Sequence, residues 1–316
     1  AIYIVYLLPI PNTTMPINII VYTRRTFMSN NITSIFQKKT VYSFEIFPPK
    51  KTSPIDTIYT TIEKLHSLNP DFISVTYGAG GSNVGVSTVD IASTIQEQYN
   101  IKSMAHLPCI NYTKEEIVKI LDEFKSKNIT NILALRGDIN PNIEPKQDFK
   151  HACELIQFIK EHGDFDIAGA CYPEGHLESE TIAQDIKYLK YKVDCGAEHL
   201  ISQLFFDNDT FYSFLERCDI ANIKVPIEAG IMPVTNIKQI QRMVSMCGAS
   251  LPSKFTKVMQ RYENSPEALR DAGIVYAIDQ IVDLISQDVD GIHLYTMNNP
   301  YVAEKITNAI ENIINA

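Results

Sequence analysis

The fold is decided by residues 41–50, which read Val41-Tyr42-Ser43-Phe44-Glu45-Ile46-Phe47-Pro48-Pro49-Lys50. The mostly apolar run at their start predicts a buried strand. The two prolines end this strand, because neither can donate a hydrogen bond to a sheet. One carboxylate, Glu45, lies inside the run. Since burial favours the neutral form of a carboxylate, Glu45 either points into water or is a carboxylic acid that serves as a proton donor.

Outside this stretch the chain alternates between short apolar runs and segments with a helical spacing of apolar residues. The further predicted strands are residues 71–76, 102–107, 131–135, 167–172, 199–205, 225–231 and 291–296. The predicted helices are residues 55–67, 84–98, 113–126, 149–162, 179–193, 209–219, 237–247, 266–287 and 302–314. Eight strands with helices between nearly all of them indicate a parallel sheet. Eight repeats favour an α/β fold of the (β/α)8 TIM barrel type over an open sheet.

The first 27 residues are predicted to be an N-terminal extension outside the core, and residues 28–316 to be a single barrel domain. The segment from Ile2 to Ile10 is apolar, but Pro9, Pro11 and Pro16 interrupt it well short of a membrane span. The segment also lacks the basic region and the cleavage site of a signal peptide. We therefore expect no membrane partner.

Charge and cysteine content argue against several classes of protein. Lys and Arg total 28, Asp and Glu total 37, and the net charge is −9. No basic run of the kind that binds a phosphate backbone is present. The six cysteines form no C-x-x-C pair and match neither zinc nor iron–sulfur spacing. We therefore expect no nucleic-acid partner and no metal site, and, because the thiols are interpreted as reduced, a cytoplasmic protein.

Polar and aromatic residues gather at the carboxyl ends of the predicted strands, where the active sites of such barrels lie. They are Glu45, Thr76, Tyr77, His106, Arg136, Asp138, Tyr172, Gln203 and Asn298. Strand ends are polar in part because they leave the core. An acid, an imidazole, an Arg-Gly-Asp turn and two phenols at one mouth nevertheless indicate a real site. Aromatic and hydrogen-bonding groups without a metal set or a Ser-His-Asp arrangement suit a planar cofactor.

Five motifs carry a resemblance to a known family. They are Ser43-Phe44-Glu45-Ile46-Phe47-Pro48-Pro49-Lys50, Val75-Thr76-Tyr77-Gly78-Ala79-Gly80-Gly81, Leu135-Arg136-Gly137-Asp138, Tyr172-Pro173-Glu174-Gly175-His176 and Gln203-Leu204-Phe205-Phe206-Asp207. In this order, from about Met28 to the C-terminus, they resemble the methylenetetrahydrofolate reductase family in its bacterial form, which has the catalytic domain alone. The resemblance implies a (β/α)8 barrel that binds FAD and reduces 5,10-methylenetetrahydrofolate to 5-methyltetrahydrofolate with NADH or NADPH.

The resemblance also implies roles for particular residues. Glu45 matches the general acid that protonates N10 of the folate, after which hydride passes from FAD N5 to the methylene group in a ping-pong reaction. Asp138 would lie between the flavin and the pterin and act on both. Gln203 and Gln239 would bind the folate, and Thr76 would contact the nicotinamide. The implied FAD contacts are Tyr77, Ala79, His106, Arg136, Gly137, Asp138, Ala152, Tyr172, His176, Asp185 and Lys192.

Some of these residues also have a second, ordinary interpretation. Asp185 and Lys192 are seven residues apart on one predicted helix and so share a face. Judged from these two residues alone, that face would be solvated. The other prominent histidines are interpreted as surface or core residues and not as ligands, and they are His151, His162, His199 and His293.

Four positions depart from the family pattern, and two other functions stay open. The departures are Ala229 before the Ile-x-Pro turn, Asn299 near the eighth strand, and Tyr188 and Tyr191 on the predicted FAD helix. One alternative function is a flavoprotein subunit of the same reaction that a partner electron carrier reduces. The other is a barrel that binds folate and does no redox chemistry. We also expect a homo-oligomer.

Overall fold

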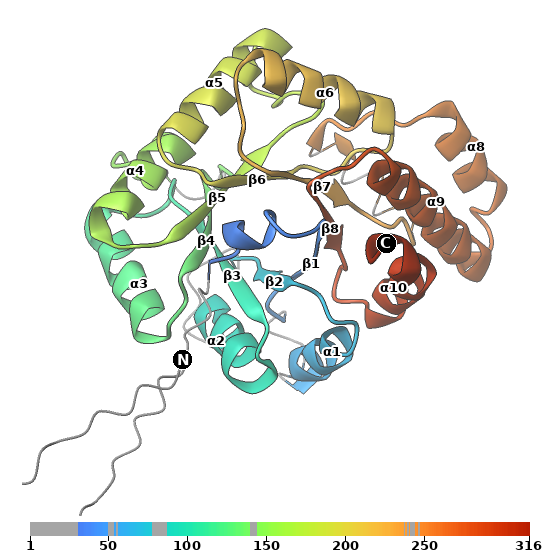
Figure 1. The fold of residues 1–316 in the computed structure, drawn as a ribbon, viewed down its shortest axis with the longest axis horizontal. Coiled ribbons are helices and arrows are strands. Elements are labelled where there is room, and N and C mark those ends of the chain that lie inside the picture. The colour runs from blue at the N-terminus through green and yellow to red at the C-terminus, as the bar shows by residue number, and fades with distance from the viewer. Residues whose placement is uncertain are drawn as a thin grey trace, which may run out of the picture.

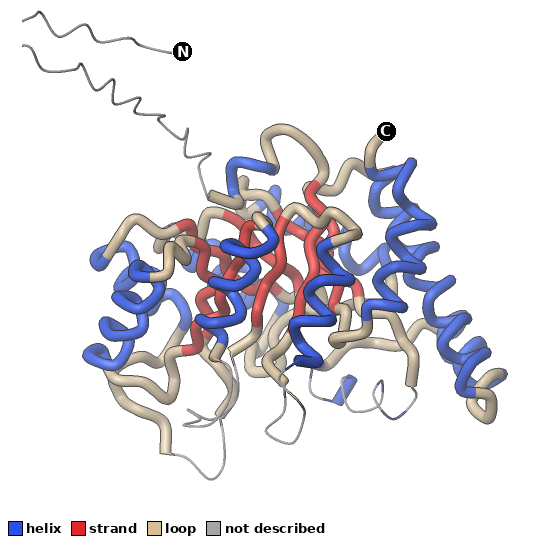
Figure 2. Tube along the Cα trace, turned by 90° about the horizontal axis from the view of Figure 1, so that it is seen from below, coloured by secondary structure: helices blue, strands red, loops and turns tan. Residues whose placement is uncertain are grey.

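Eight parallel strands, each hydrogen-bonded to the next, close into a barrel in chain order from β1 to β8 (Figure 1). This computed structural model describes residues 31–49, 54, 56–77, 87–139, 144–236, 238, 240, 244–245 and 247–316. Figure 2 shows the strands in the centre of the molecule, where they form the barrel, and the helices around them. The predicted (β/α)8 barrel is therefore confirmed, whereas the predicted extension over residues 1–27 lies outside the described residues.

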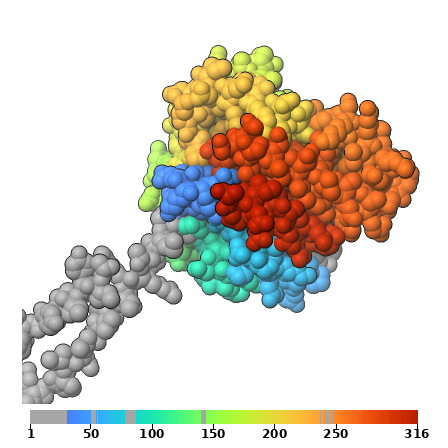
Figure 3. All heavy atoms as spheres, turned by 45° about the vertical axis from the view of Figure 1, so that its right-hand side comes forward, coloured from blue at the N-terminus to red at the C-terminus, as the bar shows by residue number. Residues whose placement is uncertain are grey.

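The strands are β1 (Val41–Ile46), β2 (Phe72–Val75), β3 (Lys102–Pro108), β4 (Asn131–Leu135), β5 (Asp166–Cys171), β6 (His199–Ser202), β7 (Ile227–Ile231) and β8 (Gly291–Tyr295). The helices are a short 3-10 turn η1 (Thr33–Ile35), then α1 (Asp56–His66), α2 (Thr88–Tyr99), α3 (Lys114–Ser126), α4 (Ala152–His162), α5 (Ile182–Asp194), α6 (Asn208–Ile220), α8 (Ser253–Arg261), α9 (Pro266–Ser286) and α10 (Pro300–Ile314). In Figure 3, helices α9 and α10, coloured orange to red, cover one side of the molecule. The first residues that the structure describes, coloured blue, lie next to them.

Local sequence signals explain where several helices begin. A capping box begins α3, in which the side chains of Thr113 and Glu116 each accept a hydrogen bond from the other's backbone N–H. The N-cap of α6 is Asp207, whose side chain accepts from the Asp209 N–H. Both α4 and α5 begin three residues later than predicted. In α5 the reason is Thr181, whose side chain accepts from the Gln184 N–H and fixes the first turn there.

Two elements differ from the prediction in a more informative way. Strand β6 ends just before Gln203. The Gln203 N–H still donates to the Cys171 carbonyl of β5 at 2.7 Å, but the next N–H, that of Leu204, donates to the Gln203 side chain and not to a neighbouring strand. Helix α8 was not predicted, since its mostly polar sequence buries only Phe255 and Met259. The predicted helix over 237–247 lies partly outside the described residues.

The interior of the barrel is closed at its amino end. Alternate residues of a strand face opposite sides, so Phe44 and Ile46 pack against helices while Val41 faces inward. An apolar layer crosses the interior, with η1 at its centre (Figure 1), and comprises Ile32, Val41, Phe72, Met104, Leu133, Ala168 and Ile201. The Thr33 N–H and hydroxyl both donate to Asp166, at 2.8 and 2.6 Å. In the part of the chain that the structure describes, this layer therefore fills the amino end of the barrel interior.

Candidate active site

The predicted acid Glu45 lies near the end of β1 and points into the barrel, with 16% of its side chain exposed. Its Oε2 atom is 3.5 Å from His106 Nε2 and 3.7 Å from His293 Nε2. The sequence placed Glu45 and His106 at one mouth, and the structure brings them together there. His293 is an additional neighbour, from the strand that closes the barrel against β1.

The electrostatics of this end depend on His106. Burial lowers the pKa of His106 to about 4, although the nearby Glu45 raises it. Among the described residues, His106 Nε2 has no hydrogen-bond partner. At neutral pH the ring is therefore uncharged. It presents Glu45 with a polar nitrogen and not with a fixed positive charge.

The loop after β8 holds the end of β1 in place. The Thr296 hydroxyl donates to the Glu45 carbonyl at 2.7 Å. The Asn298 side chain accepts from the Phe47 N–H at 3.0 Å and donates to the Phe47 carbonyl at 2.8 Å. Asn298, predicted at the mouth, thus gives the Phe47 backbone the two hydrogen bonds that a neighbouring strand would otherwise supply.

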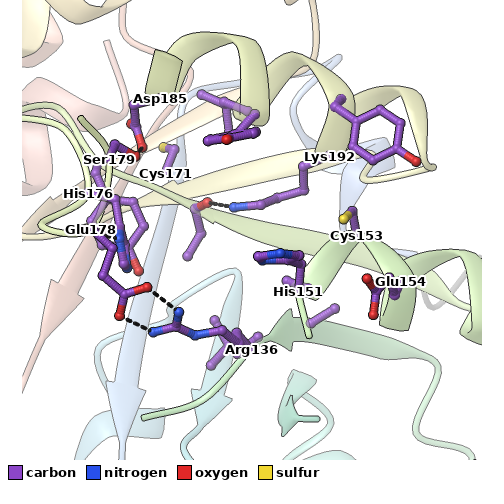
Figure 4. Close-up of a pocket in the computed structure, with 18 residues that line it drawn as sticks. Arg136, His151, Cys153, Glu154, Cys171, His176, Glu178, Ser179, Asp185 and Lys192 are labelled. Atoms are coloured by element: carbon purple, nitrogen blue, oxygen red, sulfur yellow. Dashed lines mark hydrogen bonds and ion pairs between the residues drawn. The ribbon is translucent and has the colours of Figure 1, made fainter. Parts of the chain in front are cut away.

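A cavity of about 440 Å³ opens beside the ends of β4 and β5, under helix α5 (Figure 4). Six of the residues predicted to contact FAD line it, and they are Arg136, Ala152, Tyr172, His176, Asp185 and Lys192. The face shared by Asp185 and Lys192 is thus turned to the cavity and not to bulk solvent. Tyr188 and Tyr191, two of the departures from the family pattern, also line the cavity, and both are more than half exposed.

Two cations face this cavity, and each already has a partner in the chain. The Arg136 guanidinium binds the Glu178 carboxylate through two hydrogen bonds, of 2.5 and 2.8 Å (Figure 4). This pair raises the pKa of Arg136 and lowers that of Glu178. The Lys192 ammonium donates to the Ala170 carbonyl at 2.5 Å. Burial lowers the pKa of Lys192, so a nearby anion would strengthen its charged form.

The remaining walls are a carboxylate and two rings. Asp185 is buried and accepts from the Ser179 hydroxyl at 2.8 Å. The rings of Tyr172 and His176 meet edge to face, with centroids 4.7 Å apart. Burial raises the pKa of Tyr172 to about 12 and lowers that of His176, so both stay uncharged at neutral pH. Cations, a hydroxyl-binding carboxylate and aromatic rings together fit a large anionic ligand with an aromatic portion.

The other predicted site residues lie at strand ends but do not line this cavity. Thr76 and Tyr77 directly follow β2, and the Tyr77 ring packs edge to face on Tyr112 at 5.9 Å. Gly137 follows β4 with a φ of 88°, which a residue with a side chain rarely adopts, and exposes Asp138 after it. Gln203 directly follows β6. Two predicted residues lie outside the described parts of the chain, and they are Ala79 and Gln239.

Sequence reasoning missed two residues beneath Glu45. His293 was interpreted as a surface or core histidine, and the structure shows it fully buried. Its position next to Glu45 was not foreseen. Glu228, on β7, is fully buried in the barrel. A signal for it existed, because Glu228 is a carboxylate inside an apolar run, as Glu45 is. The other two departures from the family pattern are structural here: Ala229 is buried in β7, and Asn299 caps α10.

Searches of the described residues for other kinds of site gave two findings. They contain no group of three or more His, Cys, Asp or Glu side chains arranged to hold a metal ion. None of their helices combines the length and the apolar composition that a membrane crossing needs.

The sequence is similar to known proteins over most of its length. Residues 30–311 match the family model described as Methylenetetrahydrofolate reductase. The 5,10-methylenetetrahydrofolate reductase of Pectobacterium carotovorum subsp. carotovorum is 37% identical over 268 residues, which cover 85% of this chain and 89% of that protein. The protein of the same name from Escherichia coli (strain K12) is 34% identical over 268 residues, with 85% and 90% covered. Methylenetetrahydrofolate reductase (NADH) 1 of Arabidopsis thaliana is 35% identical, but the match covers 47% of the plant protein.

A solved structure shares the fold. It is described as an uncharacterized protein from Clostridium thermocellum that binds two copies of 5-methyl-5,6,7,8-tetrahydrofolic acid. Its TM-score is 0.63, and the match covers 90% of this chain and 99% of that chain. At 12% sequence identity, this likeness concerns the barrel architecture alone.

Proposed function

The chain belongs to the methylenetetrahydrofolate reductase family and is an oxidoreductase, and we propose that it reduces 5,10-methylenetetrahydrofolate through a bound FAD with Glu45 as the general acid. NADH or NADPH would reduce the cofactor in the first half of a ping-pong cycle, and folate would leave as 5-methyltetrahydrofolate in the second. The observation that supports this proposal best is the position of Glu45 at the barrel mouth, with two imidazoles within 4 Å.

Glu45 would supply the proton that opens the folate ring. Protonation of N10 breaks its bond to the bridging methylene, which leaves an iminium on N5 of the folate ready to accept hydride. When bound, FAD supplies that hydride from its N5 atom. The neutral His106 and the hydrogen-bonded end of β1 hold the carboxyl group at the mouth without stabilising its anion by a fixed charge. Asp138 and Gln203 would orient the pterin, and Thr76 would orient the nicotinamide.

The cavity beside α5 supports the FAD part of the proposal. Lys192 and Arg136 would bind the two phosphate groups, and Asp185 would accept hydrogen bonds from ribose hydroxyls. The uncharged Tyr172 and His176 rings would border the flat part of the cofactor. Ala79 and Gln239 keep their predicted contacts with FAD and folate as part of this proposal, as do the homo-oligomer and the cytoplasmic location.

The purified protein provides the first test. We expect a yellow protein whose absorbance near the flavin maximum bleaches under anaerobic NADH or NADPH and returns when 5,10-methylenetetrahydrofolate is added. A yellow protein that neither nucleotide bleaches would favour the alternative of a partner electron carrier. A colourless protein that binds folate and takes up no FAD would favour the non-redox barrel.

The second test separates the two half-reactions. Glu45→Gln should slow reoxidation of the reduced protein by 5,10-methylenetetrahydrofolate by about 10²- to 10⁴-fold, the usual contribution of a positioned general acid. Reduction of the flavin by NADH needs no such acid and should change little. Glu45→Asp keeps an ionisable carboxyl group and serves as the control, with partial activity expected. Parent-like folate reduction by Glu45→Gln would refute the role of this residue.

A further inference from the structure

A second buried carboxylate lies deeper in the barrel than Glu45. Glu228 is on β7, directly opposite Gly291 of β8. A Cβ atom at Gly291 would lie 2.8 Å from Glu228 Cγ, so the glycine is what leaves room for the glutamate. The proposed reaction makes no use of Glu228. A buried ionisable group without a structural ion pair therefore needs an explanation.

A chain of polar contacts joins the two carboxylates. The Ser43 hydroxyl donates to Glu228 Oε1 at 2.7 Å and lies 2.6 Å from His293 Nδ1. The other ring nitrogen, His293 Nε2, is 3.7 Å from Glu45 Oε2. The order from the interior to the mouth is Glu228, Ser43, His293 and Glu45. Ser43 and Glu45 can serve one chain because they are two apart on β1 and face the same side.

The surroundings isolate this chain from water on the inner side. The apolar layer with Val41 and Ile201 lies below it. The other Glu228 oxygen, Oε2, has no hydrogen-bond partner among the described residues. The charged or titratable groups that act on Glu228 are His293, Asp71 and Asp290. Glu45 is further bordered by His106, and His293 Nε2 lies 3.4 Å from the Ser74 hydroxyl. Among the described residues, Ser43 is thus the side chain that hydrogen-bonds to Glu228.

We propose that Glu228 is a proton reservoir that reloads Glu45 through Ser43 and His293. In this step the Ser43 hydroxyl turns from Glu228 Oε1 to His293 Nδ1, the Glu228 O–H proton passes to Ser43 Oγ, and the Ser43 proton passes to His293 Nδ1. The proton on His293 Nε2 passes to the Glu45 carboxylate. Glu228 ends as a carboxylate and Glu45 as a carboxylic acid, while His293 gains a proton on Nδ1 and loses one from Nε2. No electrons move, and the proton count is unchanged.

The reservoir matters whenever a ligand at the mouth separates Glu45 from water. The proposal rests on Glu45 as the acid of the proposed function, which gives up one proton per folate reduced. With the mouth covered, water cannot return that proton directly, whereas the buried chain can. Once the mouth opens, the same contacts run in reverse and refill Glu228. The 3.7 Å gap between His293 and Glu45 needs only a small side-chain rotation, which is common in ligand-free sites.

The reservoir predicts a difference between single and repeated turnovers. In Glu228→Gln, one turnover of FAD-loaded, prereduced protein at pH 6 should proceed within about twofold of the parent, because the reservoir acts only after the first proton has been used. Steady-state turnover at the same pH, at which Glu228 of the parent carries its proton, should fall about tenfold, because reloading becomes limiting. Ser43→Ala, which cuts the same chain, should show the same split. Asp290→Asn is the control, since Asp290 acts on Glu228 but is outside the chain, and it should show no split.

An infrared titration tests the reservoir without measuring activity. The parent protein should show the carbonyl band of a protonated, buried carboxyl group that disappears as pH rises through neutrality. Glu228→Gln should lack this band, and Glu45→Gln should shift its titration, because the two carboxyl groups share one chain. The reservoir is refuted by a Glu228→Gln protein that keeps the parent's steady-state pH profile. It is equally refuted if single and repeated turnovers fall by the same factor. By contrast, parent-like folate reduction in Glu45→Gln would refute the proposed function itself.

Discussion

The barrel interior below Glu45 and the cavity beside α5 are both polar, but they satisfy their polar groups in different ways. In the interior, Ser43 links His293 and Glu228, and all three are fully buried. In the cavity, Arg136 pairs with Glu178, whose side chain is 57% exposed. The interior network is therefore assembled by folding, whereas the cavity keeps charges that a ligand can take over from weak partners.

This difference determines which measurement should respond to a mutation. A change in the interior alters groups that are buried only in the folded chain, so the free energy of unfolding and its pH dependence should change. A change in the cavity should alter ligand affinity and leave unfolding nearly unaffected. The following variants test this separation, beginning with the largest expected effect.

The largest effect concerns the pH dependence of stability at Glu228. Burial raises the pKa of Glu228 from 4.5 to about 7. Between these values the folded protein binds the proton and the unfolded protein does not, so the free energy of unfolding falls as pH rises. The loss at pH 8 amounts to about 3 kcal/mol. Glu228→Gln cannot ionise, so its stability relative to the parent should rise by about this amount between pH 4.5 and pH 8.

Urea unfolding of both proteins across this pH range measures the effect. Only the difference between variant and parent is informative, because the buried His106, with its lowered pKa, makes the opposite contribution to the pH dependence. Glu123→Gln, an exposed change on α3, should give a flat difference. A flat difference for Glu228→Gln as well would mean that Glu228 is ionised or solvated in the folded protein, and would contradict the interior network.

The fold could be predicted because its signals are local. Apolar runs and helical spacing involve residues that lie close together in the sequence, so strands and helices can be identified from them. The positions of Arg136 and Tyr172 at strand ends follow from the predicted strands. Helix α8 was missed because polar residues dominate it and only Phe255 and Met259 mark its buried face. The end of β6 was misplaced because side-chain bonds at Gln203 stop the strand where apolar residues continue.

The interior network could not be predicted from local signals. Ser43 meets His293 because β1 and β8 close the barrel in one register, across 250 residues of chain. The meeting of Ser43 with Glu228 needs the position of β7 in addition. Sequence periodicity determines which face a residue is on, but it does not determine which residue lies opposite. The sequence signal for the network was Glu228, a carboxylate inside an otherwise apolar predicted strand.

A second interior variant tests how tightly the network is packed. Gly291→Ala would place a Cβ 2.8 Å from Glu228 Cγ and 3.0 Å from the Val41 carbonyl. Neither neighbour can move freely in the closed barrel, so we expect a loss of about 2 kcal/mol in the free energy of unfolding. The affinity for FAD should not change. In a double-mutant cycle, adding Glu228→Ala should recover part of the loss, and strict additivity would place the strain elsewhere.

Lys192→Met tests the cavity side of the comparison. The variant keeps most of the side chain's apolar stem but removes the ammonium group, so the affinity for FAD should fall about tenfold. Fluorescence quenching of FAD by the cofactor-free protein measures this change. Lys187→Met, an exposed change on the same helix, is the matched control and should bind as the parent does. If Lys192→Met changed unfolding by more than binding, Lys192 would belong with the structural groups of the interior.

The smallest effect is expected at Glu178. Because Glu178 is mostly exposed, its pair with Arg136 should contribute less than about 1 kcal/mol to stability. If a phosphate of FAD displaces Glu178 from Arg136, Glu178→Gln removes a competing anion and should tighten FAD binding about threefold at low salt. The gain should disappear in high salt, and Glu180→Gln, two residues away and also exposed, should not show it. Weaker binding in Glu178→Gln would mean that Glu178 holds Arg136 in position for the ligand, so that this part of the cavity, like the interior, is organised by folding.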